Sequence, residues 1–145
     1  MADYVGSQVG LGETVGPVPP VILPCKAGAA ITKGDFVKLS DAQDFTVVAA
    51  GANDDVLGVA MKEAQAAGEY IPVCVFGIVK MECGGTVTAG NAVASNSEGL
   101  PVDVADQAVD EGGTATYTIY YNHVAGIALQ SGGDGDYVLI FVGRR

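Results

Sequence analysis

The sequence has no tryptophan, one histidine and three cysteines in 145 residues. Any Ser-His-Asp or Cys-His arrangement has to use His123, and no nucleophile or acid motif accompanies that residue. Cys25, Cys74 and Cys83 are too few and too unevenly spaced for a disulfide framework or a CxxC metal site. We therefore expect no catalytic residue, no metal and no cofactor, and we predict that the protein is not an enzyme.

Basic residues and long apolar runs are scarce as well. Seven lysines and arginines stand against 17 acidic residues, which gives a formal net charge of -10. That charge repels phosphate backbones and argues against a nucleic-acid partner. No apolar run approaches the roughly 20 residues of a membrane-spanning helix, and no basic region followed by an apolar one marks a signal peptide. The pattern predicts no membrane partner and assembly in a cytoplasm.

Glycine is abundant, with 21 residues, and it separates short runs of β-forming residues. We predict strands at Phe36–Leu39, Phe45–Val48, Val56–Met61, Tyr70–Phe76 with a continuation through Met81, and Tyr137–Val142. Only Lys62–Gly68 has helix-forming composition, and its length allows no more than a turn of helix or a wide loop. Many short strands and 49% apolar residues favour one all-β domain, a small barrel or sandwich.

The chain also repeats itself. Ile31–Val37 is echoed by Val87–Val93, Val56–Met61 by Val124–Leu129, and Gly68–Gly77 by Gly135–Gly143, which is one residue shorter. Three matched blocks in one order indicate an internal duplication. We predict two repeats, about 27–83 and 84–143, that pack on each other in a domain spanning residues 26–145. About 12 extra residues in the second repeat fall in the acidic segment 105–116, which is typical of a surface loop.

Residues 1–25 do not follow the repeat, and they hold four of the six prolines. Proline lacks the N–H that a regular ladder needs, so we expect an extended N-terminal arm. The arm is more apolar than a solvated linker, and we predict that it docks on a partner, for example as a strand added to a sheet edge; a frayed terminus is the alternative. Its candidate contact residues are Tyr4, Val5, Val9, Leu11, Val15, Val18, Val21, Ile22 and Leu23.

Several short motifs resemble one known family. They are Ala27-Gly28, Ile31–Val37, Gly51–Asp54, Val56–Ala60, and Gly68-Glu69 before Val73–Gly77. In this combination the chain is similar to the small capsid decoration, or cement, proteins of tailed phages, over about residues 26–143. The resemblance implies a structural protein with a β-clip or β-tulip-like body, bound outside a phage head, that locks neighbouring capsid subunits together and reaches the shell with its N-terminal arm.

The resemblance also implies partners. We expect the major capsid protein and further copies of the chain, with a homotrimer favoured and a dimer as the alternative. Tyr120, Arg144 and Arg145 are candidate interface residues. A second hypothesis is a glycan-binding or host-surface module of the virion, in which Tyr117, Tyr120 and Tyr121 stack on sugar rings.

Overall fold

The computed structural model describes residues 9–15, 19–104 and 124–143, and these residues form strands and turns with no helix. The strands are β1 (Val21–Ala27), β2 (Phe36–Leu39), β3 (Thr46–Ala49), β4 (Val56–Ala60), β5 (Tyr70–Glu82), β6 (Ala92–Ser95), β7 (Pro101–Asp103), β8 (Gly126–Ala128) and β9 (Tyr137–Val142). The all-β prediction is confirmed. The segment 62–68, for which a helical turn was one expectation, is a loop that Ala64 ties to Ile31 through two backbone hydrogen bonds of 2.9 Å.

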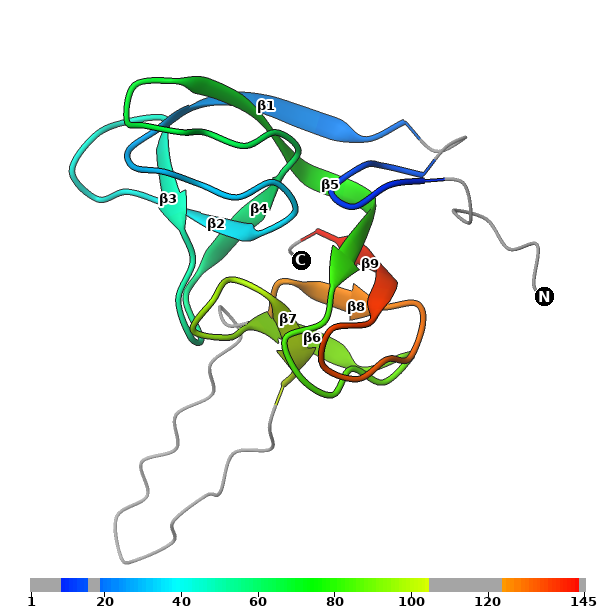
Figure 1. Cartoon of the computed structure of the whole chain (residues 1–145). Helices are drawn as coiled ribbons and strands as arrows, with labels where there is room; N and C mark the ends of the chain where they lie inside the picture. The colour runs from blue at the N-terminus through cyan, green and yellow to red at the C-terminus, as the bar shows by residue number, and fades with distance from the viewer. Residues whose placement is uncertain (1–8, 16–18, 105–123, 144–145) are drawn as a thin grey trace, which may run out of the picture.

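Five strands close into a small barrel in the order β1-β3-β2-β4-β5, because β1 pairs with β5 as well as with β3 (Figure 1). β1 runs parallel to β3 and antiparallel to β5. Alternate residues of each strand point inward, as the pleat requires. The buried side chains of this interior are Cys25, Ala27, Ile31, Val37, Val47, Ala60, Ala64, Ile71 and Val73, and Leu23, Leu57 and Val75 are partly buried against them.

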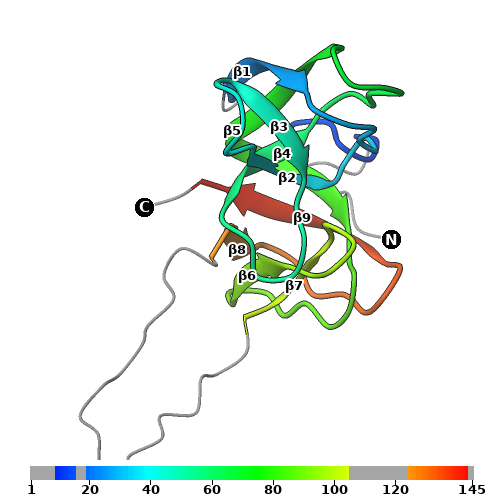
Figure 2. The same cartoon turned by 90° about the vertical axis from the view of Figure 1, so that its left-hand side faces the viewer.

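The long strand β5 belongs to two sheets. Its first half closes the barrel, and Gly77–Glu82 then pairs with β9 in a second sheet of order β5-β9-β8-β6-β7. In Figures 1 and 2, β5 runs from the barrel to the second sheet, which lies below it. A second core fills the space between the two parts, with Phe36 and Val59 from the barrel and Met81, Val93 and Ile140 from the second sheet.

Pairings in the second half follow those of the first. β2–β3, β2–β4 and β4–β5 are antiparallel pairs, and so are β6–β7, β6–β8 and β8–β9. Val59 pairs with Cys74, and Ile127 with Phe141. When the two halves are aligned by these pairs, Tyr70 is equivalent to Tyr137 and Val75 to Val142, and no residue is skipped between them. The one-residue shortening expected from the sequence is therefore not needed within these strands.

The structure differs from the sequence prediction at the N-terminal segment. The predicted end of the arm, at residue 25, falls within β1, so residues 21–25 are part of the barrel. Pro24 lies opposite Pro72 of β5, and a register shift between Val21 and Ile22 accommodates the irregular end of the strand. The prolines therefore did not prevent pairing, because the remaining residues of β1 supply the ladder and its alternate side chains fill the barrel.

Candidate functional site

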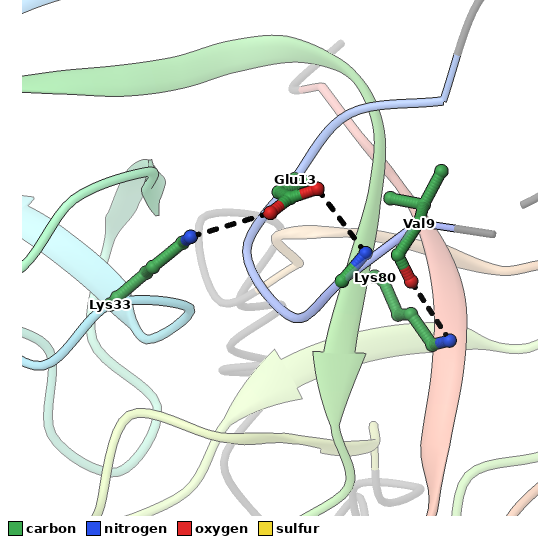
Figure 3. Close-up of polar contacts among 5 residues, drawn as sticks. Val9, Glu13, Lys33 and Lys80 are labelled. Carbon is green, nitrogen blue, oxygen red and sulfur yellow. Dashed lines mark hydrogen bonds and ion pairs between the residues drawn. The ribbon is translucent and has the colours of Figure 1, made fainter.

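Residues 9–15 of the N-terminal segment lie along β5. The Gly12 N–H donates to the Lys80 carbonyl at 2.8 Å, and the Val15 N–H donates to the Ile78 carbonyl at 3.0 Å. Lys80 Nζ donates to the Val9 carbonyl at 3.0 Å, and Lys33 Nζ lies 3.5 Å from Glu13 Oε2 (Figure 3). Residues 9–15 of the predicted arm are thus held against the protein's own second sheet.

The candidate arm residues differ in exposure. Val21 and Ile22 are 50% and 40% exposed, whereas Val15 is buried at 3%. Val9, Leu11 and Leu23 are half-buried. Tyr4, Val5, Val18, Tyr120, Arg144 and Arg145 lie outside the described residues, as do His123, Tyr117, Tyr121 and the insertion 105–116. Of the described candidates, only Val21 and Ile22 are therefore large side chains with substantial exposure.

One end of the barrel opens into an apolar hollow of about 300 Å³, which we call the barrel mouth. Its apolar walls are Leu23 and Cys25 of β1, Leu39 of β2, Leu57 of β4, and Phe45, while Ser40, Gln43 and Asp44 complete the lining. Leu39 is 52% exposed and Phe45 is 68% exposed. The sequence placed Leu23 and Cys25 in the predicted arm, with Leu23 as a candidate contact residue, and it assigned no surface contact to the other lining residues.

Phe45 has an unusual backbone conformation, with φ of 52°. Positive φ is uncommon for non-glycine residues and is a genuine outlier for a bulky one. The hairpin that follows β6 shows the ordinary solution. Leu39 pairs with Val47 and Ser95 with Pro101, so Gly99, with φ of 79°, occupies the place of Phe45. An exposed aromatic ring stands where the matching turn uses glycine.

Hydrogen bonds hold Phe45 in this conformation. Its carbonyl accepts from the Lys26 N–H of β1 at 2.9 Å, and the next residue, Thr46, accepts from the Ser40 N–H at 2.7 Å. The first bond joins the hairpin to the strand that closes the barrel. The backbone of Phe45 therefore cannot relax to a negative φ without weakening the hydrogen bond that joins the hairpin to β1.

An acidic hollow of about 330 Å³ adjoins the barrel mouth and shares Leu39 and Leu57 with it. Its other lining residues are Lys38, Asp54 and Asp55. Lys38 Nζ pairs with Asp54 Oδ2 at 2.9 Å, and the same carboxylate oxygen accepts from the Gly51 N–H at 2.7 Å. With Asp44, three carboxylates and one ammonium line the two hollows, which gives the pair a negative charge.

A second apolar surface lies on the outer side of β5, β9 and β8, and we call it the sheet face. Its large side chains are Phe76, Ile127, Leu129 and Tyr137, which are between 45% and 51% exposed. Phe76 packs edge-on against Phe141, with ring centroids 5.1 Å apart. Ile127 lies directly opposite Phe141 in the ladder. The side chains that alternate with these point into the core. These strands therefore carry apolar side chains on both faces, and the sheet face leaves its apolar groups exposed to solvent.

The three cysteine thiols are buried. Burial raises the pKa of Cys25 and Cys74, and burial followed by nearby carboxylates, Asp136 first, raises the pKa of Cys83 to about 11. A thiol with a raised pKa is a poor nucleophile at neutral pH. In residues 9–15, 19–104 and 124–143, no group of three or more His, Cys, Asp or Glu side chains is placed to hold a metal ion.

Asp35 is a carboxyl group with a strongly raised pKa. Burial, followed by the charges of Glu82 and Glu98, raises the pKa of Asp35 to about 6. The three carboxylates come from the start of β2, the end of β5 and the hairpin after β6. They meet where the barrel contacts the second sheet, and the Phe36 N–H donates to the Gly99 carbonyl there at 2.8 Å.

Residues 18–142 match the phage cement protein family. The chain belongs to that family. Cement proteins are structural components of phage heads, and they are not a class of enzymes. Among the described residues, the structure contains no helix with the length and apolar character needed to span a membrane.

A solved structure supports the same fold for this cement protein. The N base of head fiber gp8.5 of bacteriophage phi29 is similar with a TM-score of 0.62 and 16% sequence identity, over 86% of this chain and 94% of the phi29 chain. No curated protein sequence matches the chain. The family assignment and the small β-barrel body expected from the resemblance are both confirmed, and the role of the protein as a capsid-associated part of the virion follows from the family.

Proposed function

We propose that this cement protein binds the outer surface of the phage capsid and stabilises the shell by bridging neighbouring major capsid subunits. The observation that carries the proposal is the family match over residues 18–142. The protein has no catalytic role in this proposal, and it joins the capsid exterior during assembly in the host cytoplasm. A ligand that binds the assembled lattice better than free subunits stabilises that lattice by mass action.

Surface composition supports a role in protein contacts. The sheet face and the barrel mouth together expose six large apolar side chains, namely Phe76, Ile127, Leu129, Tyr137, Leu39 and Phe45. Exposed apolar patches of this kind are typical of protein–protein interaction sites. Val21 and Ile22, at the start of β1, are the described members of the predicted arm that remain available for the shell. Val15 instead holds the segment to β5.

The proposal includes self-association, as a homotrimer with a dimer as the alternative. The sheet face is the surface that we assign to this contact, since its large apolar side chains are 45% to 51% exposed. Light scattering on the purified protein measures its mass directly. We expect wild-type protein to be oligomeric and Ile127→Ser to shift it toward the monomer. A monomeric wild-type protein at micromolar concentration would remove self-association from the proposal.

Binding to phage heads tests the main proposal. Purified protein is mixed with unexpanded and with expanded DNA-free heads, and bound protein is measured after sedimentation. We expect saturable binding to expanded heads and a higher temperature of shell disruption in its presence. Binding to free capsid subunits with the same affinity as to heads, or no binding to either head form, would contradict it.

A further inference from the structure

The barrel mouth carries a residue whose position costs stability. Phe45 is 68% exposed and adopts a φ of 52°, although the corresponding turn of the second half uses Gly99. The turn itself does not require an aromatic residue. A strained backbone that is retained in a fold points to a function of the side chain, since the surrounding structure must offset the strain. The ring forms one wall of the apolar hollow with Leu23, Leu39 and Leu57.

Charge tells what kind of partner fits. The apolar hollow continues into the acidic hollow through the shared walls Leu39 and Leu57. Asp44, Asp54 and Asp55 line the pair, with Lys38 as the cation, so the sum of their charges is negative. A second cation, Lys26, lines a third hollow that shares Ser40 and Gln43 with the barrel mouth. A complementary surface presents an apolar side chain and, next to it, a positive charge.

We propose that the two hollows form a specificity contact with the capsid, in which the barrel mouth receives an apolar side chain of the major capsid subunit and the acidic hollow binds a lysine or arginine beside it. This inference rests on the capsid binding proposed above and names its chemistry. The aliphatic stem of the basic residue lies on Leu39 and Leu57, and its charged end lies toward Asp54 and Asp55. Phe45 is the aromatic anchor of the contact.

Binding to expanded DNA-free heads is compared for the wild type, Phe45→Asn, Phe45→Trp and Asp44→Lys. Asparagine tolerates positive φ, so Phe45→Asn should fold with an unchanged or raised melting temperature. We expect its affinity for heads to fall about tenfold or more, because truncating a central aromatic anchor removes much of the binding energy. Phe45→Trp should retain binding. Asp44→Lys should weaken it, and wild-type binding should weaken as salt rises.

Tyr70→Asn and Asp134→Lys are the matched controls. The exposed fraction of Tyr70, 70%, is close to the 68% of Phe45, and Asp134 is an exposed acid of the second half. Neither residue lines the two hollows. Both variants should bind heads as the wild type does.

The inference is overturned if wild type binds heads and Phe45→Asn and Asp44→Lys bind equally well. It is also overturned if Phe45→Asn changes the mass of the free protein in light scattering and leaves head binding unchanged, since the mouth is then a contact between copies. Absence of wild-type binding contradicts the capsid proposal itself.

Discussion

Gly58 and Gly126 lie where the backbone of a neighbouring strand leaves no room for a side chain. A Cβ at Gly58 would collide with the carbonyl oxygen of Cys74, and one at Gly126 with that of Phe141. Because backbone cannot move aside as a side chain tip can, each substitution by alanine must push β4 from β5 or β8 from β9. We expect Gly58→Ala and Gly126→Ala each to lower the free energy of unfolding in urea by about 3 kcal/mol or more.

Gly133→Ala is the control for these two variants. The nearest heavy atom to its added Cβ is Asp136 Oδ2 at 3.8 Å, which is ordinary contact. Its free energy of unfolding should change by no more than about 0.5 kcal/mol. A comparable small change at Gly58 would mean that β4 and β5 separate more easily than the structure indicates.

The three cysteines are free, buried thiols. The raised pKa of Cys83, about 11, leaves little thiolate at pH 8, and burial blocks access to all three sulfur atoms. We expect a colorimetric thiol reagent at pH 8 to react with the native protein only as fast as it unfolds, and to titrate all three thiols in urea. Rapid modification of one thiol in the native protein would contradict the burial described here.

At the scale of elements, the N-terminal segment has two parts with different roles. Residues 9–15 bond to the outer edge of β5, whereas β1 closes the barrel. Deletion of residues 1–15 should lower the free energy of unfolding by about 2–4 kcal/mol, given roughly 1 kcal/mol for each lost backbone hydrogen bond and the exposure of apolar surface. Far-ultraviolet circular dichroism should still show the β-sheet spectrum.

Deletion of residues 1–22 should have a larger effect. It removes Val21 and Ile22 from β1, which pair with Phe76 and Cys74 of β5. We expect loss of the sharp, cooperative urea transition, since the barrel then lacks part of its closing strand. Loss of head binding by that deletion would therefore not identify a shell contact. The exposed pair is better tested with Val21→Ser and Ile22→Ser.

At the scale of the whole molecule, the two parts meet at a cluster of carboxylates. The pKa of Asp35 is raised to about 6 in the folded protein, against an ordinary value of 3.8. Between these values the folded state binds more protons than the unfolded state, so the contribution of Asp35 to stability falls as pH rises from about 4 to 6. We expect Asp35→Asn to raise the melting temperature at pH 7.5 and to have a smaller effect at pH 4.

The exposed variant Asp41→Asn controls for removal of a charge from an acidic protein. It should shift the melting temperature much less than Asp35→Asn at pH 7.5, because Asp41 lies on the exposed hairpin after β2. Equal shifts in melting temperature for the two variants would mean that the effect comes from net charge and not from the carboxylate cluster where the barrel meets the second sheet.

Local sequence patterns predicted most strands because strand propensity and turn residues act over a few neighbours. Phe36–Leu39 and Tyr137–Val142 have the predicted bounds, and β3 is displaced by one residue. β1 was not recognised as part of the barrel, since its closure depends on partners some 50 residues away in β5, and its prolines suggested an arm. The barrel mouth was missed for the same reason. Alignment of the hairpin after β2 with the hairpin after β6 makes Phe45 equivalent to Gly99. That alignment would have shown an aromatic residue at a turn position that suits glycine.

β5 passes through both sheets as one strand of 13 residues. A force applied to the barrel therefore reaches the second sheet along covalent bonds, with no linker that can stretch in between. Hydrogen bonds to β4 and β1 on one half, and to β9 on the other, would all have to shear together before the strand gives way. The continuous strand should therefore make the protein resistant to tension between its two sheets, which suits a protein attached to a capsid under internal pressure.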